Sequence, residues 1–341
     1  MKAKRAFAAT LLLVLGLCLG RVSHAQSPEL VMRDYSSGQI KKGVRSIGFG
    51  GDGATWGNYG LVWKDAGSAL VDYGDTRFTD GNEFRFAAVG ATSPALWNGL
   101  AIYLIAMSQD SNDVGFNAKS PGLGPSAVPV IGSGRDQALF SKIAMPLGNG
   151  VSAGVLLSYE VSKFDATSVS NPAQSVRYET EWRPSGGFGV AWQPNDKLLA
   201  GFRALLNTDL ERRIDSTGKA EGTARSQEYR LGISVSPWKG GWLDAGVTAL
   251  EKRNELNATH SSETHPNLGL EQWFLNRRLA LRFGLDETSP TAGLTYKVPP
   301  FNLDVAYVRN MAKARSELFG SESNSVIATL SLDYRSFSGR P

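Results

Sequence analysis

Cysteine and histidine are nearly absent from this chain. Of its 341 residues, one is cysteine, Cys18, and three are histidine. A disulfide framework needs at least two cysteines, so cross-links cannot supply stability, and sites built on cysteine are excluded as well. No G-x-S-x-G motif occurs, and His260 and His265 lie in a polar segment rather than on a predicted strand. The sequence therefore predicts a protein that is not an enzyme and has no metal site and no cofactor.

A surplus of one charge is also missing once the N-terminus is set aside. Four of the 36 Lys and Arg residues lie in the first 25 positions, together with none of the 32 Asp and Glu residues. The remainder therefore holds 32 residues of each sign and has no net charge. This balance excludes a strongly basic protein that binds nucleic acid.

Long apolar runs are missing too, apart from a short one in the leader. Met1–Ala25 has three basic residues in its first five positions, an apolar core at Ala6–Gly20, and small residues at Ser23 and Ala25 before Gln26. These are the parts of a cleavable secretory signal peptide. No later stretch reaches the roughly 18 consecutive apolar residues of a membrane-spanning helix. We therefore expect export into a bacterial envelope without a second membrane helix.

After about residue 80, the sequence alternates with a period of two. Ala200, Phe202, Ala204 and Leu206 fall on one face of such a segment, and Arg203 falls on the other. Four further segments repeat the pattern, with one apolar face and one face of charged residues, glycine and serine. They run about 9–15 residues, which is longer than the 5–6 residues of an ordinary strand in a soluble protein. The alternation predicts an all-β fold with unusually long strands.

The connections between these segments alternate in length. Short turns of Pro, Gly and Asn separate long polar stretches. The long stretches are Gln109–Gly134, Asp165–Gln174, Thr208–Ala224, Asn254–Pro266 and Asn310–Ser323. Short turns at one rim and longer loops at the other are typical of outer-membrane β-barrels, and closure removes the exposed edges of long strands. We therefore predict a transmembrane antiparallel β-barrel at residues 69–341, with a large soluble β protein as the alternative.

Thirteen segments can be counted from Glu83 onward. An antiparallel barrel needs an even number, because its first and last strands must run in opposite directions to pair. One more strand is therefore expected before Glu83, at Ala69–Gly74 or at Val44–Gly50. The total is then about fourteen strands, and twelve are possible if Glu83–Ser93 does not span the membrane.

Residues 26–68 precede the predicted barrel and lack sustained alternation. They are rich in glycine and aromatic residues. A barrel of about fourteen strands encloses a lumen that must either be filled or conduct. We expect this segment to fold inward as an N-terminal hatch, with a periplasmic tail as the alternative. The candidate hatch residues are Gly48, Gly50, Gly51, Trp63 and Asp65.

The charged residues on the polar faces are balanced in sign. If the apolar faces point to lipid, twelve charged side chains point into the lumen, six basic and six acidic. They are Arg85, Glu160, Arg203, Glu228, Arg230, Asp244, Glu271, Arg278, Arg282, Asp304, Asp333 and Arg335. A mixed set predicts cross-strand salt bridges that fix the register of the strands and hold the hatch. A pore selective for one charge, which would need an excess of one sign, is disfavoured.

Trp182–Gly187 is an unusual stretch for a barrel wall. Pro184 removes a hydrogen-bond donor from the ladder, and Gly186 and Gly187 weaken strand pairing. Either the strand begins only at Gly186, or the wall has a bulge or an opening here. The candidate strand kink is therefore Pro184, Gly186 and Gly187.

Several stretches resemble a known group of outer-membrane barrels. Asn267–Asn310 (NLGLEQWFLNRRLALRFGLDETSPTAGLTYKVPPFNLDVAYVRN) is similar to the terminal strands of the PorV/PorQ proteins, within the wider FadL-like superfamily. Ile143–Asp165 and Gly189–Asp209 fit the same strand–turn–strand pattern. Arg45–Gly51 and Tyr59–Leu70 resemble the glycine-rich entry and the hatch motif of that group.

The resemblance implies a barrel of about fourteen strands with an N-terminal hatch. It has departures: Lys64 and Asp65 replace the Asn-Pro of the hatch motif, and Phe337 is followed by four further residues instead of ending the chain. FadL-like members import hydrophobic molecules, in some cases through a kinked strand that opens into the membrane, whereas PorV-like members serve protein secretion. Fold alone does not decide between these functions.

Three functions follow as hypotheses for an outer-membrane protein. The first is transport of small hydrophobic molecules past the hatch. The alternatives are a PorV-like structural component of a secretion or surface-assembly system, and a general-diffusion porin. The expected partners are outer-membrane lipid and the barrel assembly machinery, together with a small hydrophobic solute or an envelope protein, and no nucleic acid.

Overall fold

The computed structural model describes residues 68–78, 81–93, 99–118, 123, 128–181, 183–256, 258–286, 289–309 and 323–333. The predicted signal peptide and hatch lie outside this part of the chain. Among the described residues, no helix is long and apolar enough to cross a membrane.

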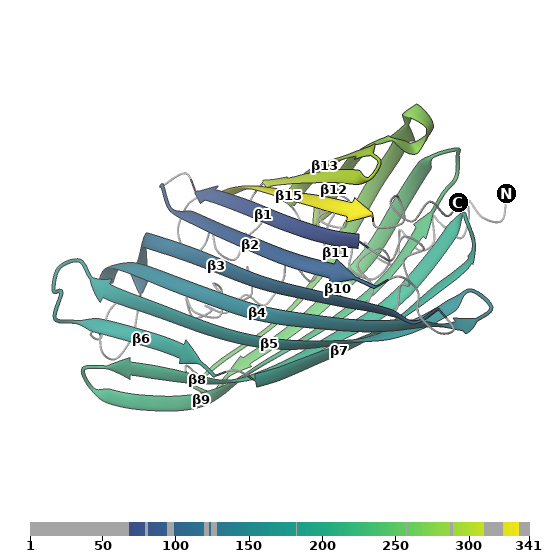
Figure 1. Ribbon diagram of the computed structural model, residues 1–341. Coiled ribbons are helices and arrows are strands. Elements are labelled where there is room, and N and C mark those ends of the chain that lie inside the picture. The colour runs from purple at the N-terminus through teal and green to yellow at the C-terminus, as the bar shows by residue number, and fades with distance from the viewer. Residues whose placement is uncertain are drawn as a thin grey trace.

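The described part of the chain folds into one antiparallel sheet (Figure 1). Its strands are β1 (Ser68–Phe78), β2 (Glu83–Thr92), β3 (Ala101–Ala118), β4 (Val128–Gly148), β5 (Val151–Ser168), β6 (Ser175–Thr180), β7 (Arg183–Asn195), β8 (Leu198–Asp215), β9 (Gly218–Val235), β10 (Gly241–Asn254), β11 (Thr259–Phe274), β12 (Leu279–Asp286), β13 (Ser289–Val298), β14 (Phe301–Arg309) and β15 (Ser323–Asp333). A single turn of 3₁₀-helix, η3 (Leu275–Arg277), joins β11 to β12.

The sheet closes on itself, because β1 pairs with β15 along its whole length, from Ser68 opposite Asp333 to Phe78 opposite Ser323. Segments β6 and β7 share one place in the wall, since both lie between β5 and β8. Fifteen segments therefore fill fourteen positions. The predicted fourteen-stranded antiparallel barrel is confirmed, and β1 is the additional strand that the even count requires.

The two rims of the barrel differ. Ser68 and Asp333, the ends of the wall, lie at the same rim as the tight turns at 149–150, 196–197 and 299–300. Short turns are periplasmic in barrels of this kind. The opposite rim is built differently from the prediction, because the expected loops at Gln109–Gly134, Thr208–Ala224 and Asn254–Pro266 are largely strand; of Asn310–Ser323 only Ser323 is described. The β8–β9 pairing continues to Asp215 opposite Gly218, so that its loop shrinks to residues 216–217.

The wall is much taller on one side than on the other (Figure 1). Strands β3, β5, β8 and β9 have 18 residues each and β4 has 21, whereas β1, β2 and β12–β15 have 8 to 11. The tall strands extend past the membrane on the extracellular side. We call the part of β3–β9 that lies beyond the short strands the wing.

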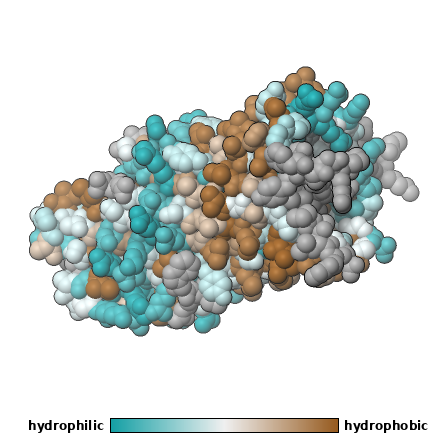
Figure 2. All heavy atoms as spheres, viewed as in Figure 1, coloured by the Kyte–Doolittle hydropathy of each residue, from teal (hydrophilic) through white to brown (hydrophobic). Residues whose placement is uncertain are grey.

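The outer surface of the barrel carries a belt of exposed apolar side chains. Figure 2 shows a brown band that crosses the visible face, with hydrophilic residues beyond it. Members of this belt are Val71, Tyr73, Val89, Leu104, Leu139, Leu157, Phe188, Leu206, Leu231, Leu270, Phe283, Leu303, Tyr307 and Leu330. In the same strands the alternate, buried side chains include Arg203, Arg282 and Glu271. This is the reverse of a soluble protein, and with the closed barrel it places the chain in the outer membrane.

Beyond the apolar belt, the outer face carries charges in one continuous cross-strand row. The row has one residue on each of eight strands that are neighbours in the wall, and its members pair in register. In order they are Asp75, Arg85, Asp110, Arg135, Lys163, Glu179, Arg212 and Glu221. Four are acidic and four are basic, and ion pairs join several of them, such as Asp110 to Arg135 at 2.7 Å. Opposite charges in cross-strand positions stabilise the pairing of strands.

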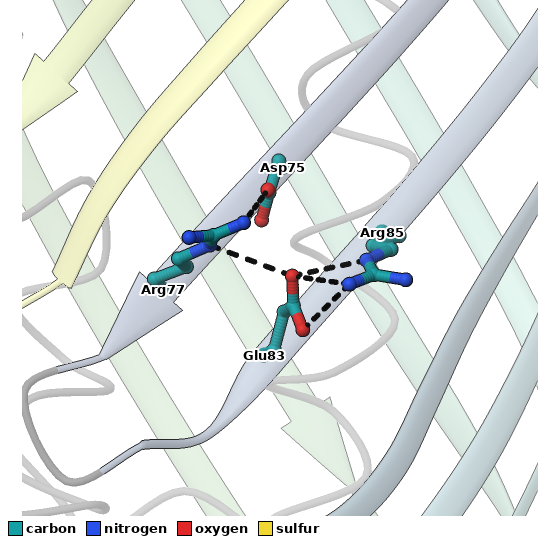
Figure 3. Close-up of polar contacts among 4 residues, drawn as sticks. All are labelled: Asp75, Arg77, Glu83 and Arg85. Carbon is teal, nitrogen blue, oxygen red and sulfur yellow. Dashed lines mark hydrogen bonds and ion pairs between the residues drawn. The ribbon is translucent and has the colours of Figure 1, made fainter.

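Figure 3 shows the start of this row at the β1–β2 hairpin. Arg85 binds Glu83 through two nitrogens at 2.8 to 3.0 Å. Arg77 lies between Asp75, at 3.0 Å, and Glu83, at 3.5 Å. All four side chains stand on the outer face of the wall, which corrects the sequence-based placement of Arg85 in the lumen. Above the apolar belt, a charged side chain meets water on the outside of the barrel as readily as on the inside.

Candidate functional site

The inner wall of the barrel has an apolar side. One buried cluster comes from the inward faces of β2–β5, β8, β14 and β15. Its members are Phe86, Ala88, Met107, Ala138, Phe140, Leu156, Leu205, Ala306, Val308 and Ile327. We call this cluster the apolar arc. Sequence reasoning missed this cluster because it assigned every apolar face of a strand to lipid. The signal that could have revealed the cluster is a strand with apolar residues on both faces, as in residues 84–91.

Two glycines allow the arc to continue across strands that contribute no side chain to it. Gly74 on β1 lies in register between Ile327 and Phe86. The ring of Phe86 occupies the place where a Cβ of Gly74 would stand. On β7, Gly187 lies in register between Leu156 and Leu205. At the level of the arc the inner surface is therefore apolar from β14 round to β8, while Asp72, Gln109 and Glu160 are buried elsewhere on the inward faces of the same strands.

The other side of the inner wall, from β8 to β14, is charged. Arg282 on β12 is 1% exposed, and its Nε donates to Oε2 of Glu271 on β11 at 2.7 Å. Its two remaining nitrogens reach Thr295 and, at 3.4 Å, Asp304. Trp273 donates its indole N–H to the other oxygen of Glu271, at 2.7 Å. Every strand from β11 to β14 thus contributes to one buried polar network.

A second network lies beside the first. Arg203 on β8, 1% exposed, donates to Glu228 on β9 at 2.7 Å, and Arg230 donates to the same carboxylate at 2.8 Å. Ser234 donates to Asp244 on the next strand. Desolvation of charges this deep costs several kcal/mol per ion, which is offset when partners and hydrogen bonds are in place. Paired in this way, the charges hold neighbouring strands together and leave little field of one sign in the lumen.

The structure places most of the predicted lumen charges on the inner face. These are Glu160, Arg203, Glu228, Arg230, Asp244, Glu271, Arg282 and Asp304, and Asp333 shares that face. Two predicted positions differ. Arg85 stands on the outer face, and Arg278 is exposed in the turn after η3, where its backbone N–H bonds to Phe274. Arg335 lies outside the described residues, as do the five candidate hatch residues Gly48, Gly50, Gly51, Trp63 and Asp65.

The strand position shared by β6 and β7 is interrupted. Toward β5, two residues separate Glu160 from Lys163, whereas three separate their partners Arg183 and Glu179. Toward β8, four residues separate Leu206 from Glu211, whereas five separate their partners Gly186 and Thr180. The extra residue makes this a β-bulge. Between the register pairs Gly186–Leu206 and Thr180–Glu211, the backbone bond described is Glu181 N–H to Leu210 C=O, at 3.4 Å.

The predicted strand kink lies directly beside this interruption. Strand β7 begins at Arg183, so Pro184, Gly186 and Gly187 are strand residues and Gly186 is not the first of them. Thr180 compensates in part, because its Oγ1 accepts the backbone N–H of Ser162 at 2.7 Å. Of the two alternatives left by the sequence, a strand start at Gly186 is wrong and a bulge is what the wall contains.

Buried polar side chains line the inside of the interrupted stretch. Ser158 is fully buried and donates to Oε1 of Glu160 at 3.0 Å. Ser185, Asn207 and Asp209 are also buried, with 3 to 7% exposed. Sequence reasoning missed Ser158, Ser185, Asn207 and Asp209, because nothing in a single strand shows which neighbours lie opposite a bulge. Together they form a polar margin at the edge of the apolar arc.

A second apolar cluster lies toward the extracellular rim, on the inner side of the hairpins that begin the wing. It comprises Phe78, Phe84, Val114, Leu123, Val130, Phe164, Ala166, Val176 and Tyr178. Phe78 and Phe84 meet edge to face at 5.5 Å between ring centroids. The wing is therefore charged on its outer face, and its inner face is apolar over β3–β6 and charged on β8, where Asp209 and Glu211 are buried.

Comparison with known proteins finds likeness in structure alone. No family model matches the chain, and no curated protein matches its sequence. The toluene transporter TodX of Pseudomonas putida superposes with a TM-score of 0.51 at 12% identity, over 86% of this chain and 98% of that one. The toluene transporter TbuX of Ralstonia pickettii gives 0.51 at 11%, over 85% and 97%. A FadL homologue of Pseudomonas aeruginosa gives 0.50 at 11%, over 78% and 90%.

The chain has the FadL-type barrel fold. The match spans 90 to 98% of the length of these three proteins. At 11 to 12% identity the likeness establishes the architecture and leaves the solute open. It does not distinguish the PorV/PorQ group within the wider superfamily.

Proposed function

We propose that this FadL-type barrel transports small hydrophobic molecules across the outer membrane. The observation that carries the proposal is the apolar arc, which lines a membrane-spanning lumen with buried aliphatic and aromatic side chains. A water-filled channel is polar inside. The structural neighbours named as toluene transporters support the same class of solute.

The interrupted strand provides the proposed exit. A molecule that dissolves in lipid gains nothing by crossing the periplasmic rim into water, so a lateral route into the membrane suits it better. In the described part of the wall, the pairing with β8 is interrupted between the pairs Gly186–Leu206 and Thr180–Glu211, and Leu206, exposed on the outer face, lies beside this stretch. We infer that hydrophobic molecules leave the lumen here.

Cross-linking across the interruption tests this route. In a Cys18→Ser background, Ser185→Cys and Asn207→Cys can be joined by a short thiol cross-linker in intact cells. We expect toluene uptake to fall at least about fivefold on cross-linking, because the bulge can no longer open, and uptake to recover when a cleavable linker is reduced.

The matched control joins Gly187→Cys to Leu205→Cys, a pair already in register within the intact ladder. Cross-linking this pair leaves toluene uptake unchanged if the exit lies at the interruption. Equal loss in both pairs would show that the linker blocks the lumen, and no loss in either would contradict the lateral route. Cells without the barrel that take up toluene equally well would contradict the transport function itself.

The hatch and the other two functions stay predictions. A hatch formed by residues 26–68 predicts that the full chain is silent in planar bilayers and conducts when this segment is deleted. A general-diffusion porin predicts steady ohmic conductance by the full chain, and a PorV-like role predicts a stable complex with an envelope protein. The apolar arc favours neither of these alternatives.

A further inference from the structure

We propose that the molecules carried by this barrel are amphipathic, with an apolar body and one hydrogen-bond-donating group such as a hydroxyl. Asn207 is the residue that receives this group. The inference rests on the proposed transport function and narrows its solute class from hydrocarbons in general to alcohols, phenols and similar donors.

The side-chain carbonyl oxygen of Asn207 is buried without a hydrogen-bond partner in the described part of the chain. The residue as a whole is 7% exposed. Burying a carbonyl oxygen without a hydrogen bond costs free energy of desolvation, and native proteins contain few such oxygens. Such an oxygen in a lumen is suited to accept a hydrogen bond from a molecule that passes through.

The position of Asn207 joins the two surfaces that an amphipathic molecule needs. It lies two residues from Leu205 on the same inward face of β8, and Leu205 belongs to the apolar arc. The last register pair between β7 and β8 is Gly186 with Leu206, so Asn207 is the first residue of β8 beyond the ladder with β7, while it stays paired with Ser226 on β9. An apolar body can therefore lie on the arc while the donor reaches Oδ1 at the proposed exit.

The surroundings favour a neutral donor over a carboxylate. The neighbouring polar margin contains Glu160 and Asp209, both buried, and Ser158 already directs its hydroxyl to Glu160. The nearest cation on the inward face of β8 is Arg203, four residues toward the periplasm, and it already donates to Glu228 at 2.7 Å. On β4, Lys142 sits 4.4 Å above the ring of Tyr103. A carboxylate beside Asn207 would meet like charge, whereas a hydroxyl would complete an unfilled hydrogen bond.

Two solutes that differ by one group test the inference. Undecane and 1-decanol have the same length, with a methyl group in one where the other has a hydroxyl. Uptake of the radiolabelled compounds is measured in porin-deficient cells that carry equal folded amounts of the full chain or its variants, after subtraction of cells without the barrel. The variants are Asn207→Leu, which keeps the volume and removes the acceptor, Asn207→Asp, which keeps the acceptor, and Thr208→Leu on the lipid-facing side as the control.

We expect Asn207→Leu to lower 1-decanol uptake about tenfold, as loss of a buried hydrogen bond predicts, and to leave undecane uptake within about twofold. Asn207→Asp and Thr208→Leu should retain the preference for 1-decanol. If Asn207→Leu does not assemble, Asn207→Ala removes the same acceptor. Uptake of both solutes with no effect of Asn207→Leu overturns the donor preference and leaves transport intact. Uptake of neither solute by the unaltered protein overturns both proposals.

Discussion

At the scale of single residues, Arg282 shows how much the inner wall depends on complete pairing. It is among the largest fully buried side chains, and its partner Glu271 is 0% exposed. Replacing Arg282 with Met leaves that carboxylate buried without its cation, so we expect the free energy of unfolding to fall by about 3–5 kcal/mol. Urea unfolding of the protein folded into lipid vesicles measures the loss.

The double variant Glu271→Gln with Arg282→Met distinguishes pairing from packing. If the loss comes from the unpaired charge, the double variant is more stable than Arg282→Met alone. A double variant that is less stable than either single variant would contradict this account.

Gly74 leaves space on the inner wall for the ring of Phe86. A Cβ at this position would overlap the ring of Phe86, which belongs to the apolar arc. Gly74→Ala should therefore displace the ring and lower the free energy of unfolding by about 1–3 kcal/mol. Gly115→Ala is the matched control, since nothing lies within 4 Å of its added Cβ. Equal losses in both variants would point to backbone effects of glycine instead of the ring.

Glu221, at the extracellular end of β9, belongs to the charged row of the wing. Hydrogen bonds from Lys219 and Arg212 hold the pKa of its carboxyl below the ordinary value of 4.5. A carboxyl with a lowered pKa contributes stability above the pKa of the unfolded chain and loses it as the pH falls through the folded value. The stability difference between the unaltered protein and Glu221→Gln should thus be constant above about pH 5 and shrink below about pH 4. A difference that grows toward low pH would have the wrong sign.

At the scale of elements, the interruption between β6 and β7 should be the part of the wall that opens most easily. Residues 207–210 are paired with β9 alone and residues 183–185 with β5 alone, whereas most of 198–206 is paired on both sides. We expect hydrogen exchange in the stretches paired on one side to be at least about tenfold faster, because local opening there breaks fewer bonds. Mass spectrometry of exchanged peptides measures it, and uniform protection along β8 would contradict a weak point in the wall.

The alternation of apolar and polar residues predicted where the strands lie, but it did not predict where they end. Ala200 to Leu206 alternate as a wall strand should, and so do the residues up to Glu211. Beyond the apolar belt, however, both faces of a hairpin meet water, and residues such as Arg212 and Glu221 read as loop while they pair in register. Hydrophobic contrast marks a strand inside the membrane and fades outside it, so the wing could not be predicted.

The candidate site was predictable only in part, for a related reason. Charges such as Arg203 and Arg282 mark the inner face because they cannot face lipid. Apolar residues such as Phe140 and Leu205 give no such sign, because lipid and an apolar lumen attract the same side chains. Asn207 stands out only once the bulge beside it is known, and a bulge depends on three strands at once.

At the scale of the whole molecule, the wing defines an orientation that can be checked. The tip of the β8–β9 hairpin at residues 216–217 lies at the extracellular rim, and Gly218 has a φ of +123° that suits a tight turn. A peptide epitope inserted between Ser216 and Thr217 should bind antibody on intact cells, since loop tips tolerate insertion. The same epitope between Asn149 and Gly150 should be detected only after the outer membrane is opened. If intact cells bound antibody only at the epitope between Asn149 and Gly150, the wing would face the periplasm and the assigned orientation would be wrong.

The unequal height of the wall gives the mouth of this barrel a direction. If the barrel transports hydrophobic molecules as proposed, a solute that arrives over the low side, above β12–β15, would meet the apolar inner face of β3–β6 across the mouth. One that arrives from behind the wing meets charge and passes by. The rate of solute entry should then depend on the side from which the solute approaches. A neighbouring molecule packed against the low side of the rim would block entry, whereas one packed behind the wing would not.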